Sequence, residues 1–247
     1  MSVYLKQDEP DNANRLDNMR QGVLGTDASR IEGLLKVTGT APYAAEYQLD
    51  DCLEGVIVTA TIPKGEVTRI DADSVLSMPG VVTVIDDPAL IARPAQGTAG
   101  EAPEQPARKI GYFGQPIALV VAETFEQARD AAKHLSVSYR EDDDAAFDPE
   151  AVEAETKDGA TSQGDLAYAM KVAAASVDQT YRTEGHSSAA MEPHAAIAQW
   201  DGDTLTVYAS LQMLNYNISE LADSLGLDED KVRLVSRYVG GGFGSKL

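Results

Sequence analysis

The residues with the clearest chemical potential form a glycine-rich run near the end of the chain, Gly240-Gly241-Gly242-Phe243-Gly244-Ser245-Lys246. Glycine has no Cβ, so such a run can adopt positive φ angles and approach a ligand closely. A loop of this kind after a strand can present successive main-chain N–H groups to an oxyanion or phosphate. A nucleotide P-loop is excluded, because its lysine precedes the hydroxyl residue and here Ser245 precedes Lys246. Spacing alone supports a ligand loop and a plain glycine-rich turn equally.

A second group of polar residues lies between Glu184 and His194. Its glutamates and histidines could be drawn as metal ligands, but they share no helical face and lack a third partner. We therefore expect structural or hydrogen-bonding roles for His186 and His194, and no metal site. Glu192 precedes Pro193, which favours extended backbone. If its carboxylate is buried, it needs a hydrogen-bond donor.

Gln212 is a third candidate, because it follows a strand pattern that ends at Ala209 and Ser210. A neutral amide at the end of a strand can donate a hydrogen bond to a bound oxo or carbonyl oxygen. A single glutamine at such a position is more often a plain surface residue. Its local sequence does not separate these two interpretations.

Apolar patterns predict the elements that position these residues. Strands are predicted at 55–60, 67–71, 81–85, 117–122, 137–139, 176–182, 195–200, 204–209 and 232–235. Helices are predicted at 71–77, 165–175 and 219–225. Another helix is predicted after Thr124, where Gln127 completes a capping box and Phe125 begins the apolar stripe. Asp201-Gly202-Asp203 predicts a hairpin turn. The mixture indicates an α+β fold.

Composition divides the chain into a tail and two domains. Residues 1–24 are polar without an apolar period, which predicts a flexible N-terminal tail. Residues 25–150 form the first domain and include 86–109, a Pro- and Ala-rich segment expected to be a long surface loop. The acidic segment 141–163 is expected to be a solvated linker and marks the domain boundary. Residues 151–247 form the second domain.

Charge and cysteine content restrict the function classes. Acidic residues number 40 against 20 basic ones, and the net charge of −20 makes nucleic acid a poor partner. No stretch approaches the roughly 20 apolar residues of a membrane span. The N-terminus has no apolar core of the signal-peptide type, which leaves the cytoplasm and the periplasm open. Cys52 is the single cysteine, so it cannot form an internal disulfide, and we expect it to pack half-buried.

Taken together, several stretches resemble the large, molybdenum-binding subunit of the xanthine dehydrogenase and aldehyde oxidoreductase family. They occur in the family's order and spacing, and the resemblance runs from about residue 25 to the last residue. The matching stretches are 30–33, 36–43, 114–122, 191–194 and 240–246. The pattern is most similar to bacterial aldehyde oxidoreductases that use the cytosine dinucleotide form of molybdopterin.

The resemblance implies an α/β hammerhead domain over about residues 25–150, followed by the first part of a molybdopterin-binding α/β domain. It implies that the side chain of Gln212 donates to an oxo ligand of the metal complex. It also implies that the glycine loop packs against the cofactor and that Phe243 borders the substrate site. The implied cofactor-binding residues are Gln212, Gly241, Gly242, Phe243 and Gly244. Ser245, where the family often has glycine, is expected to preserve the turn.

The implied chemistry is hydroxylation of an aldehyde or N-heteroaromatic carbon, with oxygen from water and electrons passing through molybdenum. The implied partners are a small subunit with 2Fe-2S clusters and an FAD subunit. The family's general-base glutamate lies in a distant C-terminal segment, so we expect no catalytic residue here and the base beyond Leu247. Glu184 and Glu192 are not expected to replace it.

Because the chain ends in the cofactor loop, we expect the N-terminal part of a truncated or split large subunit, inactive without the remaining large-subunit segment. Two alternatives stay open at this point. One is a non-catalytic docking module for an electron-transfer subunit, and the other is an inactive truncated fragment.

Overall fold

The structure is a computed structural model that describes residues 27–91, 96–97, 100–101, 108–144, 161 and 163–246. It divides into two compact units, Met1–Pro42 and Tyr43–Leu247. The described part of the first unit contains one short helix, α1 (Gly33–Val37). The predicted tail, 1–24, and most of the predicted linker, 141–163, lie outside the described residues. The domain boundary at residue 150 therefore stays a prediction.

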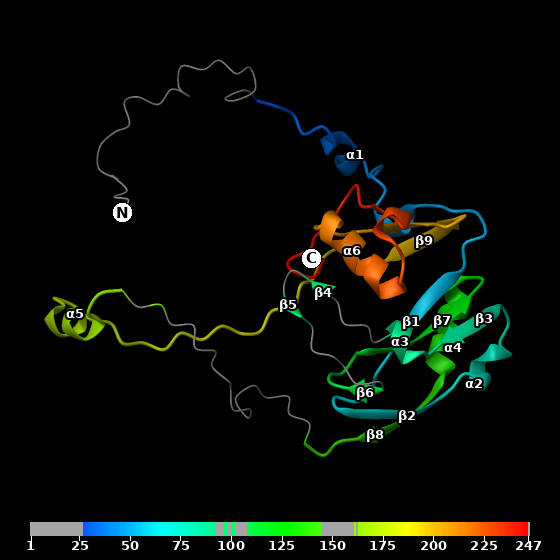
Figure 1. The fold of residues 1–247 in the computed structure, drawn as a ribbon, viewed down its shortest axis with the longest axis horizontal. Coiled ribbons are helices and arrows are strands. Elements are labelled where there is room, and N and C mark those ends of the chain that lie inside the picture. The colour runs from blue at the N-terminus through cyan, green and yellow to red at the C-terminus, as the bar shows by residue number, and fades with distance from the viewer. Residues whose placement is uncertain are drawn as a thin grey trace. The chain divides into compact units, whose positions relative to one another are not determined.

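The second unit begins with two small antiparallel sheets (Figure 1). The first has the order β1-β7-β3 and the second the order β6-β2-β8. Their strands are β1 (Glu54–Thr59), β2 (Gly65–Asp71), β3 (Val81–Ile85), β6 (Lys109–Ile110), β7 (Pro116–Ala122) and β8 (Ser136–Glu141). The strands predicted in this half are confirmed, with ends that shift by a few residues.

The segment predicted as one long loop, 86–109, contains short elements where it is described. They are helix α3 (Pro88–Ile91), the paired strands β4 (Gln96–Gly97) and β5 (Gly100–Glu101), and the first residue of β6. The prediction of a continuous loop is therefore wrong for these parts. Two-residue strands carry too little apolar pattern to be recognised from the sequence.

Strand β1 differs from its prediction in burial. The nearly continuous apolar run at residues 55–60 predicts a strand buried on both faces, but β1 is an edge strand and Ile57 is 58% exposed. The central strand β7 carries the buried positions instead, with Ala118 and Val120 fully enclosed. The two hydrophobic clusters of this half are Val75, Ala118, Val120, Ala131 and Leu135, and Ala60, Val67, Ile110 and Ile117.

Helix α4 (Phe125–His134) follows β7 directly and begins with the predicted capping box. The Gln127 N–H donates to Thr124 Oγ1 at 3.3 Å, and the Thr124 N–H donates to Gln127 Oε1 at 3.1 Å. Ala128 and Ala131 are buried, whereas Phe125, which was expected to begin the apolar stripe, is 47% exposed, so the prediction for Phe125 is wrong. The first residue of a helix lies beside the strand that precedes it and need not share the buried face.

Replacing Thr124 with alanine tests this cap. The variant loses the side-chain acceptor for the Gln127 N–H, so we expect the free energy of unfolding to fall by about 1 kcal/mol. Urea denaturation followed by circular dichroism measures the change. Thr61→Ala, at an exposed position outside the helix, is the control and should leave the midpoint unchanged. Equal midpoints for the two variants would show that the cap contributes nothing.

The last part of the chain forms a third sheet of order β11-β10-β9. Strands β9 (Ala196–Asp201) and β10 (Thr204–Ala209) form the predicted hairpin, with Gly202 at φ 60°. Helix α6 (Leu214–Leu225) then leads to β11 (Val232–Val235), which runs parallel to β10. The sequence predicts a start at residue 219, which is later than the observed start at Leu214. The true start was missed because its N-cap, Met213, provides no side-chain hydrogen bond that would mark it. Its end at Gly226, in a left-handed conformation, is confirmed.

One predicted strand is absent. Residues 176–182 alternate in polarity but adopt no regular structure, and they are exposed throughout. The strand prediction is therefore wrong, since alternation alone cannot stabilise a strand without a neighbouring strand. Helix α5 (Leu166–Val172), just before it, lies within its predicted range. Among the described residues, no helix is long and apolar enough to cross a membrane.

Candidate functional site

The glycine run after β11 is anchored at both ends to Glu192. At its start, the Gly240 N–H donates to Glu192 Oε2 at 2.6 Å, and the Gly240 carbonyl accepts from the Glu192 N–H at 3.3 Å. At its end, Lys246 Nζ lies 2.8 Å from Glu192 Oε2 and 3.2 Å from the Glu192 carbonyl. Lys246 is 1% exposed and the Glu192 side chain is 10% exposed. The loop is therefore closed by a buried ion pair.

Glu192 accepts further hydrogen bonds that stabilise its ionised carboxylate. Burial raises the pKa of Glu192, but hydrogen bonds from the Lys246 ammonium, the Ser210 hydroxyl and the main-chain N–H groups of Gly240 and Ala44 lower it more, to about 2. The Ser210 Oγ donates to Glu192 Oε2 at 2.7 Å, and the Ala44 N–H donates to Glu192 Oε1 at 3.3 Å. The carboxylate is thus ionised at neutral pH. The donor that the sequence analysis required for a buried Glu192 is present.

Gln212 lies against the same loop. Its main-chain N–H donates to the Lys246 carbonyl at 2.9 Å. Its side chain covers Gly242, where an added Cβ would lie 2.4 Å from Gln212 Oε1. Gly242 itself is buried, whereas Gln212 is exposed. Glycine at position 242 therefore allows the Gln212 amide to lie directly over the loop.

The loop is open to solvent on the face that carries Phe243 and Gly244, whereas Gly241 is half-buried and Gly242 is buried. Gly241, Phe243 and Gly244 have φ values of 109°, 52° and 89°, and the Phe243 side chain is 77% exposed. Within the described part of the chain, the main-chain N–H groups of residues 241–244 find no acceptor. The turn closes behind them, where the Ser245 N–H and hydroxyl both donate to the Gly242 carbonyl, at 3.0 and 2.8 Å. Successive unpaired N–H groups in this backbone form can receive an anionic oxygen.

The remaining polar candidates stay away from this cluster. Glu184, His186 and His194 are exposed, and no hydrogen bond ties them to the loop. No group of three or more His, Cys, Asp or Glu residues that could hold a metal occurs among the described residues. Cys52 is exposed in the turn before β1, so the expectation of a half-buried packing residue is wrong.

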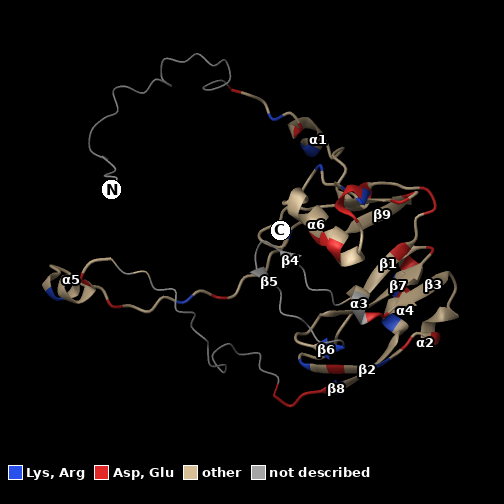
Figure 2. Cartoon of the chain, viewed as in Figure 1, with Lys and Arg blue, Asp and Glu red and all other residues tan. Residues whose placement is uncertain are grey.

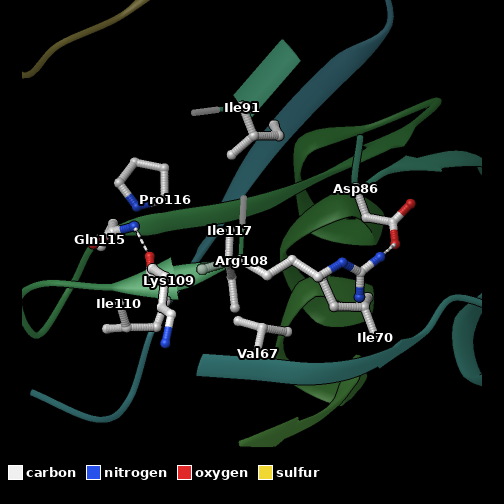
Figure 3. Close-up of a pocket in the computed structure, with 10 residues that line it drawn as sticks. All are labelled: Val67, Ile70, Asp86, Ile91, Arg108, Lys109, Ile110, Gln115, Pro116 and Ile117. Carbon is white, nitrogen blue, oxygen red and sulfur yellow. Dashed lines mark hydrogen bonds and ion pairs between the residues drawn. The ribbon is translucent and has the colours of Figure 1, made fainter. Parts of the chain in front are cut away.

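A separate small cavity lies between β2, β6 and β7 in the first half of the unit (Figure 3). Apolar side chains line most of it, together with Arg108, which pairs with Asp86 at 3.5 Å. Its volume of about 20 Å³ suits roughly one water molecule. This cavity is too small for an organic substrate. A second, more open hollow of about 390 Å³ lies between β1, α4 and β8, and its lining includes no residue of the glycine loop.

Two family models match the chain. The model described as "Aldehyde oxidase and xanthine dehydrogenase, a/b hammerhead domain" matches residues 38–143, and the "Molybdopterin cofactor-binding domain" model matches residues 148–247. The two matched ranges follow one another along the chain without overlap.

Curated relatives extend well beyond this chain. It is 39% identical to the aldehyde oxidoreductase molybdenum-binding subunit PaoC of Escherichia coli K12, over 98% of this chain and 34% of that protein. It is 30% identical to the nicotinate dehydrogenase large molybdopterin subunit of Eubacterium barkeri, over 91% of this chain and 56% of that protein. The chain thus spans about a third of the first relative's length and somewhat more than half of the second.

Solved structures share the fold. Quinoline 2-oxidoreductase from Pseudomonas putida 86 matches with a TM-score of 0.75 at 24% identity, over 90% of this chain and 31% of that one. Aldehyde oxidoreductase from Desulfovibrio gigas matches with a TM-score of 0.68 at 24% identity, over 90% of this chain and 27% of that one. Likeness at these identities establishes the architecture alone, and it confirms the predicted α+β fold.

The fold and the matched regions define a class of protein in which a hammerhead domain precedes a molybdopterin cofactor-binding domain. The chain belongs to the aldehyde oxidase and xanthine dehydrogenase family. The predicted family is confirmed, and a molybdopterin cofactor is supported for it.

Proposed function

We propose that this chain supplies the hammerhead domain and the first part of the molybdopterin site of a molybdenum hydroxylase. The complete enzyme oxidises aldehydes or N-heteroaromatic compounds with water as the oxygen source. The names of the relatives support this substrate range, since they include an aldehyde oxidoreductase subunit and a nicotinate dehydrogenase subunit. The general base and most cofactor contacts lie in large-subunit sequence beyond Leu247, so this chain alone turns over no substrate.

The observation that carries the proposal is the open face of the glycine loop beside Gln212. Four successive N–H groups, from residues 241–244, have no acceptor within the described chain and can bind an anionic oxygen of the cofactor. The loop contains no acidic residue, so its own ribbon near the C label in Figure 2 shows no red, whereas helix α6 beside it in this view does. The Glu192 carboxylate, which contacts Gly240, is paired with the Lys246 ammonium. The residues present therefore fit an anionic pterin cofactor.

Each proposed cofactor residue has a role that follows from its position. The side-chain amide of Gln212 donates a hydrogen bond to an oxygen of the metal complex, and Gly241, Gly242 and Gly244 let the backbone approach it. The exposed ring of Phe243 borders the substrate and excludes water. The bound group supplies two-electron redox chemistry at molybdenum. We propose the cytosine dinucleotide form of molybdopterin, by similarity to bacterial aldehyde oxidoreductases.

The electrons require an exit, so we propose a small subunit with 2Fe-2S clusters and an FAD subunit as partners. One relative, from Paenarthrobacter nicotinovorans, is named as subunit gamma of the 6-hydroxypseudooxynicotine dehydrogenase complex, which supports a multi-subunit assembly. The remaining large-subunit segment is the third partner. The compartment proposed for this assembly is the cytoplasm or the periplasm.

Gly242→Ala tests the site. The added methyl group would meet Gln212 Oε1 at 2.4 Å and push the amide away from the loop. The measurement uses the enzyme assembled with its remaining segment and partner subunits. We expect its molybdenum and pterin content to fall about tenfold, which is the typical effect of losing a contact that orients a metal complex. Stability should change little, because the displaced amide is the flexible end of a side chain.

Gly185→Ala is the matched control, because a Cβ there meets nothing within 4 Å and the backbone is not strained. It should retain the native molybdenum content. Molybdenum is measured by mass spectrometry and pterin by fluorescence after oxidation. A native assembled enzyme without molybdenum would refute the proposed function. Full molybdenum content in Gly242→Ala would refute the assignment of the Gln212 and Gly242 contact to the cofactor site.

A further inference from the structure

A single carboxylate contacts both ends of the glycine loop. Glu192 precedes β9, while Gly240 and Lys246 are the first and last residues of the loop. The Glu192 carboxylate accepts the Gly240 N–H and the Lys246 ammonium on the same oxygen, at 2.6 and 2.8 Å. Separation of this oxygen from either residue would release one end of the loop. The loop therefore depends on a residue that is distant in sequence.

Every donor of the Lys246 ammonium has an acceptor. An ammonium group carries three N–H donors. Around Lys246 Nζ the acceptors are Glu192 Oε2 at 2.8 Å, the Glu192 carbonyl at 3.2 Å and Ser210 Oγ at 3.2 Å. A buried ammonium without such acceptors would be strongly destabilised. The acceptors around this position therefore match the three donors of a lysine ammonium group.

The same pair also determines where Gln212 lies. Lys246 accepts the Gln212 N–H at its carbonyl, and its ammonium contacts Ser210, two residues before Gln212. The end of β10 is thereby bound to the end of the loop through main chain and side chain. As a consequence, the Gln212 amide lies over Gly242. Movement of Lys246 would change the distance between the Gln212 amide and the N–H groups of residues 241–244.

We propose that Glu192 and Lys246 are positioning residues of the molybdopterin site, which close the Gly240–Lys246 loop and hold Gln212 at a fixed place over it. This inference rests on the function proposed above. Neither residue need touch the cofactor, because the Lys246 and Glu192 side chains are 1% and 10% exposed and act through Gln212 and the main chain. A fixed arrangement of donors binds an anionic group more tightly than a mobile one, because less conformational freedom is lost on binding.

The experiment compares Glu192→Gln, Lys246→Met and Lys246→Arg with the native protein. Backbone amide exchange is measured residue by residue at Gly240 and Gln212, whose N–H groups the pair holds. In the full chain without cofactor, we expect exchange at both amides to rise at least about tenfold in Lys246→Met, since local opening controls exchange. The amides of β7 report on global unfolding and are the reference against which the extra, local opening at Gly240 and Gln212 is measured in each variant.

Molybdenum and pterin content of the assembled enzyme is the second readout. This content should fall about tenfold in Lys246→Met. It should recover at least partly in Lys246→Arg, because arginine keeps the positive charge and the hydrogen-bond donors. A residue that only filled space would need neither. Lys231→Met is the matched control, because Lys231 pairs with Asp203 on the exposed surface at 2.5 Å. It should match native protein in both readouts.

The outcomes separate this inference from the proposed function. Native exchange at Gly240 and Gln212 in both Lys246→Met and Glu192→Gln would overturn the inference, whatever the molybdenum content. Faster exchange in these variants without any change in molybdenum content would also overturn it. If the native assembled enzyme contained no molybdenum, the proposed function would fail, and the exchange data would still decide whether the pair positions the loop. Should Lys246→Met fail to fold, Glu192→Gln and Lys246→Arg supply the same comparison.

Discussion

Lys246→Met is expected to lower the free energy of unfolding by about 3–5 kcal/mol, the cost of leaving a buried charge without its partner. Methionine fills a similar volume but donates no hydrogen bond to Glu192 or Ser210. The Glu192 side chain, 10% exposed, would then carry a negative charge that only neutral donors stabilise. Urea denaturation at pH 7, followed by circular dichroism, measures the loss.

A second substitution distinguishes lost charge pairing from lost packing. In Lys246→Met, a further Glu192→Gln change removes the unpaired charge and keeps an oxygen that can accept the Gly240 N–H. The double variant should therefore be more stable than Lys246→Met alone. Lys231→Met, which breaks an exposed ion pair with Asp203, should show no measurable loss. If Lys246→Met were as stable as Lys231→Met, the buried pair would not stabilise the fold.

Local sequence patterns predicted the fold well where the signal was strong. Strand β7 and helix α4 were predicted because an apolar run meets a capping box at Thr124, and both features act over a few residues. The strand expected at 176–182 failed because a strand needs a neighbour, which no local pattern encodes. The edge position of β1 was missed for the same reason, since pairing order is a property of the whole sheet.

The candidate site was only half predictable. The glycine loop and Gln212 were identified from residue types, order and resemblance, and the structure places Gln212 over Gly242. The link between Glu192 and Lys246 was not identified, because these residues are 54 positions apart in the sequence. The one available signal was the requirement that a buried Glu192 must find a donor. That requirement predicts a donor near Glu192, but it does not identify Lys246 as the donor.

Acid should remove the stabilisation that Glu192 provides. Its pKa is lowered from 4.5 to about 2 in the folded chain, so its contribution is complete above about pH 4.5 and disappears as the pH falls through 2. The shift corresponds to about 3 kcal/mol. Other carboxylates also titrate in this range, so the informative quantity is the difference in unfolding free energy between native protein and Glu192→Gln.

We expect native protein to be the more stable of the two at pH 6, because the neutral amide introduced by Glu192→Gln cannot neutralise the buried Lys246 ammonium. The difference should shrink steadily between pH 4.5 and pH 2, as the native carboxylate gains a proton and loses its advantage. Urea denaturation at pH 6, 4, 3 and about 2 gives the four values needed. A difference that stays constant over this range would mean that Glu192 titrates normally and that its charge does not hold the loop.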